Sequence, residues 1–324
     1  MRKVKNKLLI ILSAVLLIIG IGAVRVDASA ADASKTETGR LVLNKDTLNL
    51  YGNVSTSQIY GLKDKAKVKT ISCKENCVLP EGCTYLFAGY SNCTNFYTAD
   101  NVTAGRLVYV KNKLYLIGKV SRDQILGFEN KVKVKEICCT NNCVLPEDCS
   151  YLFSGYDNCN DFNAAYSQAR VMDIKNMTGM FKGCKSLEAC VMCRTKETKY
   201  FDQMFADCPN LMFVGLEKVG KSKDCSMSRM FFGCSKLQSL DLTGFSCGMN
   251  TKAQYMFANC YCLTRLKLDD SFKVIKANMC LYSSGSIWEN EKTNEVVFEP
   301  LRTTTKNAEF VNNGINTYQR YPIY

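Results

Sequence analysis

Cysteine is the residue type in this chain with the greatest capacity for chemistry. The sequence has 19 cysteines among 324 residues and no histidine. Without histidine, Ser-His-Asp and Cys-His catalysis are excluded, and so are most catalytic zinc sites. Cys190 and Cys193 have the Cys-x-x-Cys spacing of a metal or redox motif, but no second pair of this spacing accompanies them. We therefore expect no metal site.

Two other motifs could support enzyme chemistry. Gly215–Ser222 reads Gly-x-x-x-x-Gly-Lys-Ser, the pattern of a phosphate-binding loop. However, Gly215 falls inside an expected strand, whereas a phosphate loop places its first glycine after the strand. Asp269 and Asp270 form the only adjacent acid pair of the helix–strand array of Met-Phe repeats, and an acid pair at a strand end is typical of a turn. We expect no cofactor and no catalytic residues, and we keep a secreted carboxylate-based hydrolase as a less favoured alternative.

Many of the cysteines belong to a sequence repeat. Four Met-Phe pairs start at spacings of 24, 26 and 26 residues, and each pair is followed by a cysteine and then a leucine. A period in the range of about 20–50 residues indicates stacked repeats. The four copies are Met180–Leu187, Met204–Leu211, Met230–Leu237 and Met256–Leu263.

Each copy is expected to form a helix followed by a strand. The apolar residues from Met177 to Leu187 lie within an arc of about 120° at helical spacing. After Leu187 the apolar pattern alternates, with Cys190 and Met192 on one side, which predicts a short strand. One unit has too little apolar surface to fold alone. Stacking the units predicts a solenoid with a continuous parallel sheet.

Two longer modules precede the array. Residues 40–103 and 106–169 align without gaps, and 34 of the 64 aligned positions are identical. Each module is expected to contain a hairpin, a short helix opened by a Ser-x-x-Gln capping box, and a strand with alternating lysines. Each ends in a further repeat unit that departs from the Met-Phe pattern, because Tyr90 or Tyr156 takes the cysteine position. Whether Arg170–Asn176 begins a shortened third module stays open.

The N-terminus resembles a secretion signal. Four basic residues precede an apolar run from Leu8 to Val24, and small residues suited to cleavage follow at Ala28 and Ala30. An uncleaved membrane anchor is the alternative. We expect a secreted or surface-displayed protein. The formal net charge is +12, but the charges are scattered and no run of five like charges occurs, so we expect no nucleic-acid partner.

The repeat is similar to a known family. Met230–Leu242 (MFFGCSKLQSLDL) resembles the BspA-like leucine-rich repeats of Gram-positive bacterial surface proteins, Leu79–Phe87 resembles the lead-in to such arrays, and Trp288-Glu-Asn resembles their closing strand pair. The resemblance implies an α/β leucine-rich-repeat solenoid with a parallel sheet, β-rich N-terminal modules and a C-terminal cap. The expected parts are a signal peptide (1–30), two 66-residue modules (31–169), the repeat array (170–268), and a cap and tail (269–324).

The cysteines divide into two groups. Those at repeat positions are expected to be buried free thiols that behave as small hydrophobic residues. Three others in each module surround one loop, and a secreted chain permits disulfides there. Our hypothesis is one short-range bridge per module. The loop cysteines are Cys73, Cys77 and Cys83, and then Cys139, Cys143 and Cys149.

The resemblance also implies a role in adhesion or host contact. We expect a non-enzymatic binding module that contacts an unknown protein or glycan on a host or neighbouring cell through the outward face of its sheet. Contact with a membrane is expected only through an uncleaved signal. The candidate partner-binding residues are Phe213, Asp241, Arg265 and Lys267. A purely structural cell-envelope protein is the alternative function.

Overall fold

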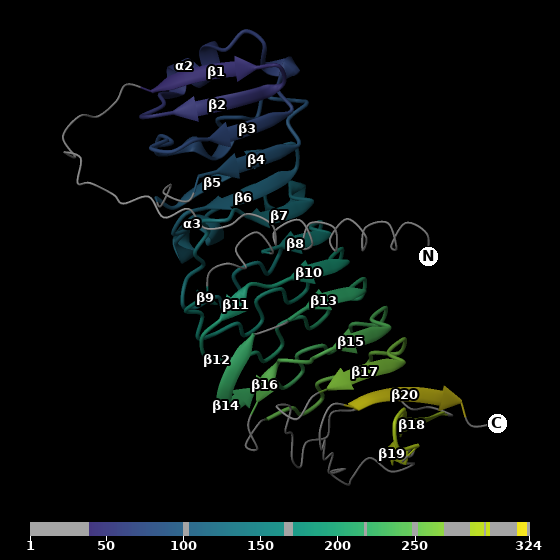
Figure 1. Cartoon of the computed structure of the whole chain (residues 1–324). Coiled ribbons are helices and arrows are strands. Elements are labelled where there is room, and N and C mark those ends of the chain that lie inside the picture. The colour runs from purple at the N-terminus through teal and green to yellow at the C-terminus, as the bar shows by residue number, and fades with distance from the viewer. Residues whose placement is uncertain are drawn as a thin grey trace. The chain divides into compact units, whose positions relative to one another are not determined.

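The computed structural model describes residues 39–99, 104–164, 171–216, 219–247, 252–268, 286–294, 296–298 and 316–322. The chain divides into two units, Met1–Glu37 and Thr38–Tyr324, and all described residues belong to the second (Figure 1). The expected signal peptide lies outside the described residues. Within the described part of the chain, no helix combines the length and the apolar character needed to cross a membrane.

The first module forms a four-stranded sheet in the order β1-β2-β3-β4. Its antiparallel hairpin and its following parallel strands confirm the elements expected from the sequence. Ser55 caps helix α2 and Gln58 bonds back to the Ser55 backbone, so the predicted capping box is present. The elements are β1 (Arg40–Asn44), β2 (Thr47–Tyr51), α2 (Thr56–Gly61), η1 (Lys65–Lys67), β3 (Thr70–Cys73), η2 (Cys83–Tyr85) and β4 (Asn95–Thr98).

The second module repeats this order and continues into the array. Its hairpin packs Val108 and Val110 against the core of the first module. The equivalent positions of the first hairpin are Val42 and Asn44, which are exposed. Asn44 is polar where the second hairpin has Val110, which suits a hairpin that caps its end of the stack. The elements are β5 (Arg106–Val110), β6 (Lys113–Ile117), α3 (Arg122–Leu126), η3 (Lys131–Lys133), β7 (Glu136–Cys139) and β8 (Asp161–Asn163).

The array contributes one short parallel strand per coil (Figure 1). The solenoid and its parallel strands are confirmed, but the expectation of one continuous sheet is wrong. The strands belong to a six-stranded sheet, β13-β10-β8-β7-β6-β5, and a five-stranded sheet that begins with β15 and β17. Another break separates the six-stranded sheet from the β1–β4 sheet of the first module. It arises because β5 is the outer strand of the β5–β6 hairpin and forms the edge of its sheet. The array strands are β10 (Ala189–Val191), β13 (Phe213–Gly215), β15 (Ser239–Asp241) and β17 (Arg265–Leu268).

A second set of parallel strands, not expected from the sequence, joins the coils on another side. Strand β14 lies between β12 and β16, and β9 pairs with β11. Gly220, Lys221 and Ser222 of the phosphate-loop pattern lie in β14, so they form extended backbone and no helix start. This agrees with the interpretation of that match as chance. The strands are β9 (Val171–Met172), β11 (Arg194–Thr195), β12 (Thr198–Tyr200), β14 (Gly220–Ser226) and β16 (Ser246–Cys247).

The Met-Phe segments are chains of turns, so the helix expected in each copy is wrong. Two positions in every copy have left-handed backbone, which interrupts a right-handed helix. The first is occupied by Gly179, Gln203, Arg229 and Tyr255, and the second by Gly183, Asp207, Gly233 and Asn259. Alternate amides bond instead to the next coil, as in Phe205 N to Met230 O at 2.8 Å and Phe231 N to Met256 O at 2.9 Å, and the amides between them close turns within the copy, as in Ala206 N to Gln203 O at 3.0 Å. These bonds satisfy the backbone without a helix.

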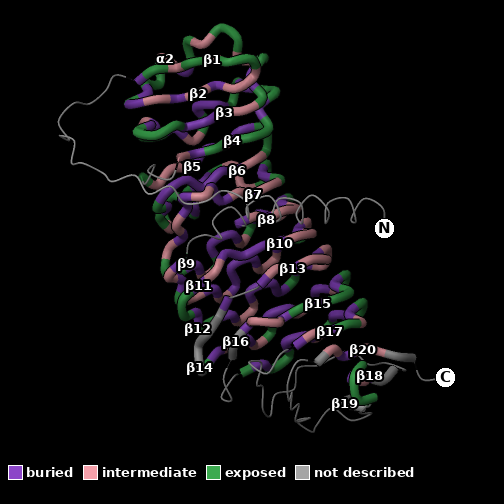
Figure 2. Tube along the Cα trace, in the orientation of Figure 1, coloured by how far each residue is buried: buried purple, intermediate pink, exposed green. Residues whose placement is uncertain are grey.

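The apolar side chains of successive coils form columns inside the solenoid. Figure 2 shows buried residues recurring in each successive coil along the Cα trace. Stacked phenylalanine rings make one column, with centroids 5.4–5.8 Å apart. Its members are Phe153, Phe181, Phe205, Phe231 and Phe257. The aromatic column and its neighbours supply the burial that no single coil could provide.

The repeat cysteines form a second column, and their predicted burial is confirmed. Each thiol donates to the carbonyl of a phenylalanine in the preceding coil, as Cys208 does to Phe181 at 3.1 Å and Cys234 to Phe205 at 3.1 Å. In the module units, Tyr156 takes this position and its hydroxyl donates to Ile125 O at 3.2 Å. The thiols therefore link coils through hydrogen bonds as well as filling space.

Three strands beyond the array confirm the expected strand pair and cover the last coil. Strands β18 (Ser286–Asn290) and β19 (Val296–Phe298) pair antiparallel, and Trp288 is 1% exposed. Strand β20 (Asn316–Pro322) pairs with both β17 and β18. Because β20 runs antiparallel to β17, it ends the parallel series.

Candidate functional site

The outward positions of the array strands form a surface that we call the outer face. Alternate residues of each strand point away from the core, and the strand registers align them in two rows. In the six-stranded sheet the first row is Asp161, Ala189 and Phe213, and the second is Asn163, Val191 and Gly215. In the five-stranded sheet, Ser239 lies beside Arg265 and Asp241 beside Lys267.

The middle of the outer face is apolar. Phe213 and Ala189 are half-buried and Val191 is 8% exposed. A Cβ atom added to Gly215 would stand 3.7 Å from Phe213 Cε1 and 3.7 Å from Val191 Cγ1. The Phe213 ring therefore extends along its strand toward Gly215 and beside Val191, so that Val191 is nearly covered while Phe213 stays half-buried. We call Ala189, Val191, Phe213 and Gly215 the apolar centre.

The charged residues on one side of the apolar centre are paired. Lys267 Nζ lies 3.0 Å from Asp241 Oδ2 on the neighbouring strand, and Arg265 Nη2 lies 3.1 Å from Glu291 Oε2 in the turn after β18. Burial alone would raise the pKa of the Asp241 carboxyl, but hydrogen bonds from Thr243 and the Lys267 ammonium outweigh it and hold that pKa below its usual range. These pairs are at least a third exposed, so each stabilises the fold only weakly, by about 0–1 kcal/mol.

Acidic residues lie on the other side. Lys113 Nζ contacts Glu136 Oε2 at 2.7 Å, and Asp161 follows Glu136 in the strand register. Burial alone would lower the pKa of Lys113, but its hydrogen bond to Glu136 and the nearby charges raise it. Further toward the N-terminus, Tyr115 is buried against Phe96 of the first module, with ring centroids 5.5 Å apart. The accessible outer face therefore begins at β7.

The structure brings some of the predicted binding residues together. Asp241 and Lys267 are in contact, and Arg265 lies in the adjacent row. Phe213 lies on β13 of the six-stranded sheet, where it belongs to the apolar centre. Val191 also lies on the outer face, although it is not among the binding residues predicted from the sequence. Glu291 was not predicted either; it follows directly after the expected strand around Trp288 and could have been found as a charged strand-end residue.

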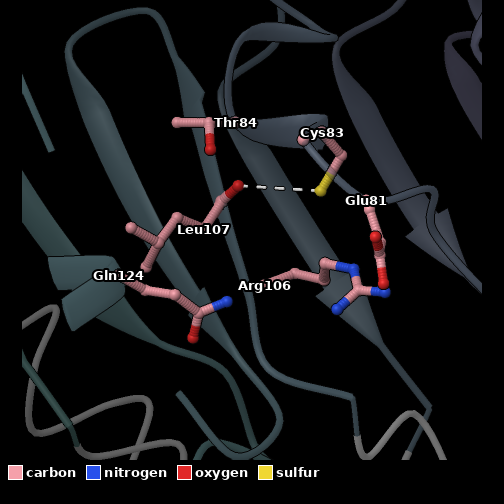
Figure 3. A pocket seen from close by; sticks show the side chains of 7 residues that line it. Glu81, Cys83, Thr84, Arg106, Leu107 and Gln124 are labelled. Carbon is pink, nitrogen blue, oxygen red and sulfur yellow. Dashed lines mark hydrogen bonds between the residues drawn. The ribbon is translucent and has the colours of Figure 1, made fainter. Parts of the chain in front are cut away.

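A cavity of about 330 Å³ lies between the two N-terminal modules (Figure 3). Arg106 donates to Leu79 O at 3.3 Å, and Gln124 donates to Gly105 O at 3.0 Å. The Cys83 thiol donates to Leu107 O at 3.7 Å, and burial raises its pKa to about 11. These polar groups bind backbone atoms of the module junction, so the contacts hold the two modules together.

Metal-binding groups are not concentrated in the described ranges. Within them, no cluster of three or more His, Cys, Asp or Glu side chains could hold a metal ion. Cys190 is buried in the core, as its repeat position predicts, but the register also predicts Cys193 on the outer face, and this is wrong because Cys193 is fully buried in the same core. In the part of the chain that the structure describes, 17 cysteines are free thiols, including Cys73, Cys77, Cys139 and Cys143.

One family model matches part of the chain. Residues 147–270 match a family described as Mycoplasma protein of unknown function, DUF285. The match begins in the repeat unit at the end of the second module and runs through the array. No curated protein matches this chain.

Solved structures of leucine-rich-repeat proteins resemble the chain. A structure of the Toll–Spatzle complex from Drosophila has a TM-score of 0.38 at 14% identity and covers 72% of this chain and 28% of that one. A leucine-rich repeat protein from Eubacterium ventriosum has a TM-score of 0.31 at 15% identity, covering 75% of this chain and 63% of the other. The chain thus spans less than two thirds of either protein. The leucine-rich-repeat solenoid described above follows from the repeat register and the coil-to-coil hydrogen bonds of the chain itself.

Proposed function

We propose that this chain is an exported protein-binding module, related to the BspA-like surface proteins, and that it contacts its partner through the outer face. The observation that carries the proposal is the apolar centre of Ala189, Val191, Phe213 and Gly215 between two groups of charged residues. A less charged centre with aromatic contacts and a polar rim is the usual composition of a protein interface.

The architecture supports binding as the activity. A solenoid presents one residue row per coil, and such extended sheet faces are the usual contact surfaces of repeat proteins. The residues of the face are also held rigidly, because each strand is bonded on both sides or packed on the next coil. A partner therefore meets a preformed surface, which lowers the entropic cost of binding.

The proposal is tested by comparing variants in a capture experiment with secreted and cell-surface proteins. Phe213→Ser removes the ring of the apolar centre and is expected to weaken capture at least tenfold, because aromatic anchors dominate interface energies. Tyr255→Ser is the matched control, since Tyr255 is 46% exposed but lies on a Met-Phe turn segment. Equal loss in both variants, or no loss in Phe213→Ser, would contradict the proposal. Capture of a glycan instead would assign the face to carbohydrate.

The charged residues can be tested without losing their ion pair. The double variant Asp241→Lys/Lys267→Asp keeps opposite charges in contact but exchanges their positions. We expect the fold to be retained and partner binding to be weakened by this swap. Unchanged binding in the swap and in Arg265→Glu would remove these three residues from the interface.

Export is a separate part of the proposal and rests on the N-terminal sequence. Fractionation of a producing culture into medium, wall and membrane is expected to place the chain outside the cytoplasm, with the first 30 residues removed. Retention of residues 1–30 in a membrane fraction would favour the anchor instead.

A further inference from the structure

Each N-terminal module holds two cysteines on either side of one tight turn. Cys73 ends β3 and Cys77 follows four residues later, and Cys139 and Cys143 repeat this arrangement at the end of β7. All four side chains are at most 2% exposed. Burial and the neighbouring Cys77 thiol raise the pKa of Cys73, and the neighbouring Cys143 thiol and burial raise the pKa of Cys139.

The third cysteine of each module has a different partner. Cys83 donates its thiol to Leu107 O at 3.7 Å, and Cys149 donates to Pro146 O at 3.1 Å. The repeat cysteines likewise donate to carbonyls of the preceding coil. The structure therefore selects one pair from the three loop cysteines of each module.

The backbone fixes the turn between the paired cysteines of the first module. Lys74 N donates to Leu50 O at 2.9 Å, and Val78 N donates to Gly52 O at 2.9 Å. Between these anchors, Cys77 N closes the turn on Lys74 O at 3.0 Å. Both sides of the turn are thus held by the preceding hairpin, which fixes the backbone of Cys73 and Cys77 on either side of it.

The second module has the same three hydrogen bonds. Thr140 N donates to Leu116 O at 3.0 Å, Cys143 N to Thr140 O at 3.0 Å, and Val144 N to Gly118 O at 2.9 Å. The arrangement therefore occurs twice, in two modules whose surrounding residues differ at nearly half of their positions.

We propose that Cys73–Cys77 and Cys139–Cys143 are sites of oxidation that form one disulfide within each module. In each step two thiols lose two protons and two electrons and gain one S–S bond. The oxidant is a disulfide, either glutathione disulfide or a thiol–disulfide oxidoreductase, and it is reduced to two thiols by exchange through a mixed disulfide.

The burial of these cysteines sets when the bridges form. Exchange requires a thiolate, and burial together with the neighbouring thiol raises the pKa of Cys73 and Cys139. The native reduced pair therefore reacts slowly, and the bridge forms while the module is still folding. The carbonyl-bonded cysteines of the array are held by separate coils and remain thiols.

The experiment is to refold the denatured, reduced full-length chain in a glutathione redox buffer, block free thiols, and map tryptic peptides without reduction. Trypsin cuts after Lys74, so the first bridge is expected to join two peptides. No Lys or Arg lies between Cys139 and Cys143, so the second bridge is expected as one peptide two hydrogen masses lighter than the dithiol. The array cysteines are expected to be blocked.

Blocked thiols at all four positions would overturn the proposal, and so would bridges that use Cys83 or Cys149 instead. A second measurement compares thermal unfolding with and without reductant. Reductant is expected to lower the unfolding midpoint of the oxidised chain and to leave the midpoint of a Cys77→Ser/Cys143→Ser variant unchanged. Cys208→Ser, which removes a cysteine of the array, is the matched control, and reductant is expected to lower its midpoint as well. If the double variant does not fold, the peptide map of the unaltered chain decides.

Discussion

The phenylalanine column allows a quantitative test of how the coils stabilise one another. Phe205 is fully buried and stacks on Phe181, with centroids 5.5 Å apart, and on Phe231 at 5.4 Å. Phe257 is equally buried, but among the described residues it stacks only on Phe231, at 5.8 Å. Replacing either ring with leucine keeps most of the apolar volume and removes the ring contacts.

The expected loss follows from the number of stacked neighbours. Each aromatic pair contributes about 0.5–1.5 kcal/mol beyond its buried area. Phe205→Leu should therefore lower the free energy of unfolding by roughly 1–3 kcal/mol, and Phe257→Leu by roughly half as much. The control is Phe232→Leu, because Phe232 is half-buried and takes no part in the column.

The assay is urea unfolding followed by two probes. Far-UV circular dichroism reports on all coils, and the fluorescence of Trp288, the single tryptophan, reports on the C-terminal strands. Two probes are needed because the coils of a solenoid can unfold separately. An equal loss in Phe205→Leu and Phe257→Leu, or a larger loss in Phe232→Leu, would refute the reasoning that stacking between coils stabilises the array.

Three further predictions follow from single side chains. A thiol reagent applied to the native chain at mildly alkaline pH should label the exposed Cys262 and leave Cys208 unlabelled, because burial raises the pKa of Cys208 to about 12. Peptide mapping identifies the labelled cysteines, and fast labelling of Cys208 would contradict this prediction. Tyr156→Phe should cost about 0.5–1.5 kcal/mol of stability in urea unfolding, because its hydroxyl donates to a carbonyl of the preceding coil, and an unchanged midpoint would argue against that bond. Because the pKa of Asp241 is lowered in the folded chain, its contribution to stability is present above the unfolded carboxyl pKa and is lost as the pH falls through the folded value. Lys267→Ala should reduce this acid-side loss in thermal melts, and a steeper loss would contradict the assignment.

The repeat register is the part of the fold that the sequence predicts well. The spacing of Met-Phe, Cys and Leu is enough to place Phe205 and Cys208 in the core and Phe213 on the outer face, because a stacked repeat puts equivalent residues at equivalent places. The same register recovers the less obvious units that carry Tyr90 and Tyr156. It also places Gly215 inside a strand, whereas a phosphate loop has its first glycine after the strand.

The conformation of the Met-Phe segments could not be predicted in this way. Apolar residues at helical spacing fit a helix, but the same spacing fits a chain of turns that points one side inward. The deciding feature is the pair of left-handed positions in each copy. Glycine indicates such a position at Gly179, Gly183 and Gly233, whereas Gln203 and Arg229 give no such signal. The backbone bonds to the next coil, which replace helical bonds, exist only in the stacked array.

The outer face was predicted only in part for a related reason. Alternation identifies which residues point outward, but it does not reveal which charges meet. The contact between Lys267 and Asp241 depends on strand register, and the contact between Arg265 and Glu291 depends on how the C-terminal strands return to the array. Both are long-range features that a local pattern does not encode.

Site-specific photo-cross-linking tests the proposed binding face most directly. A photoreactive phenylalanine analogue is placed at Phe213 on the outer face or at Tyr255 on the turn side, and each full-length chain is illuminated with secreted and cell-surface proteins. We predict a discrete cross-linked protein from position 213 and none from position 255. Cross-linking from position 255 alone would contradict the assignment of the outer face as the binding surface.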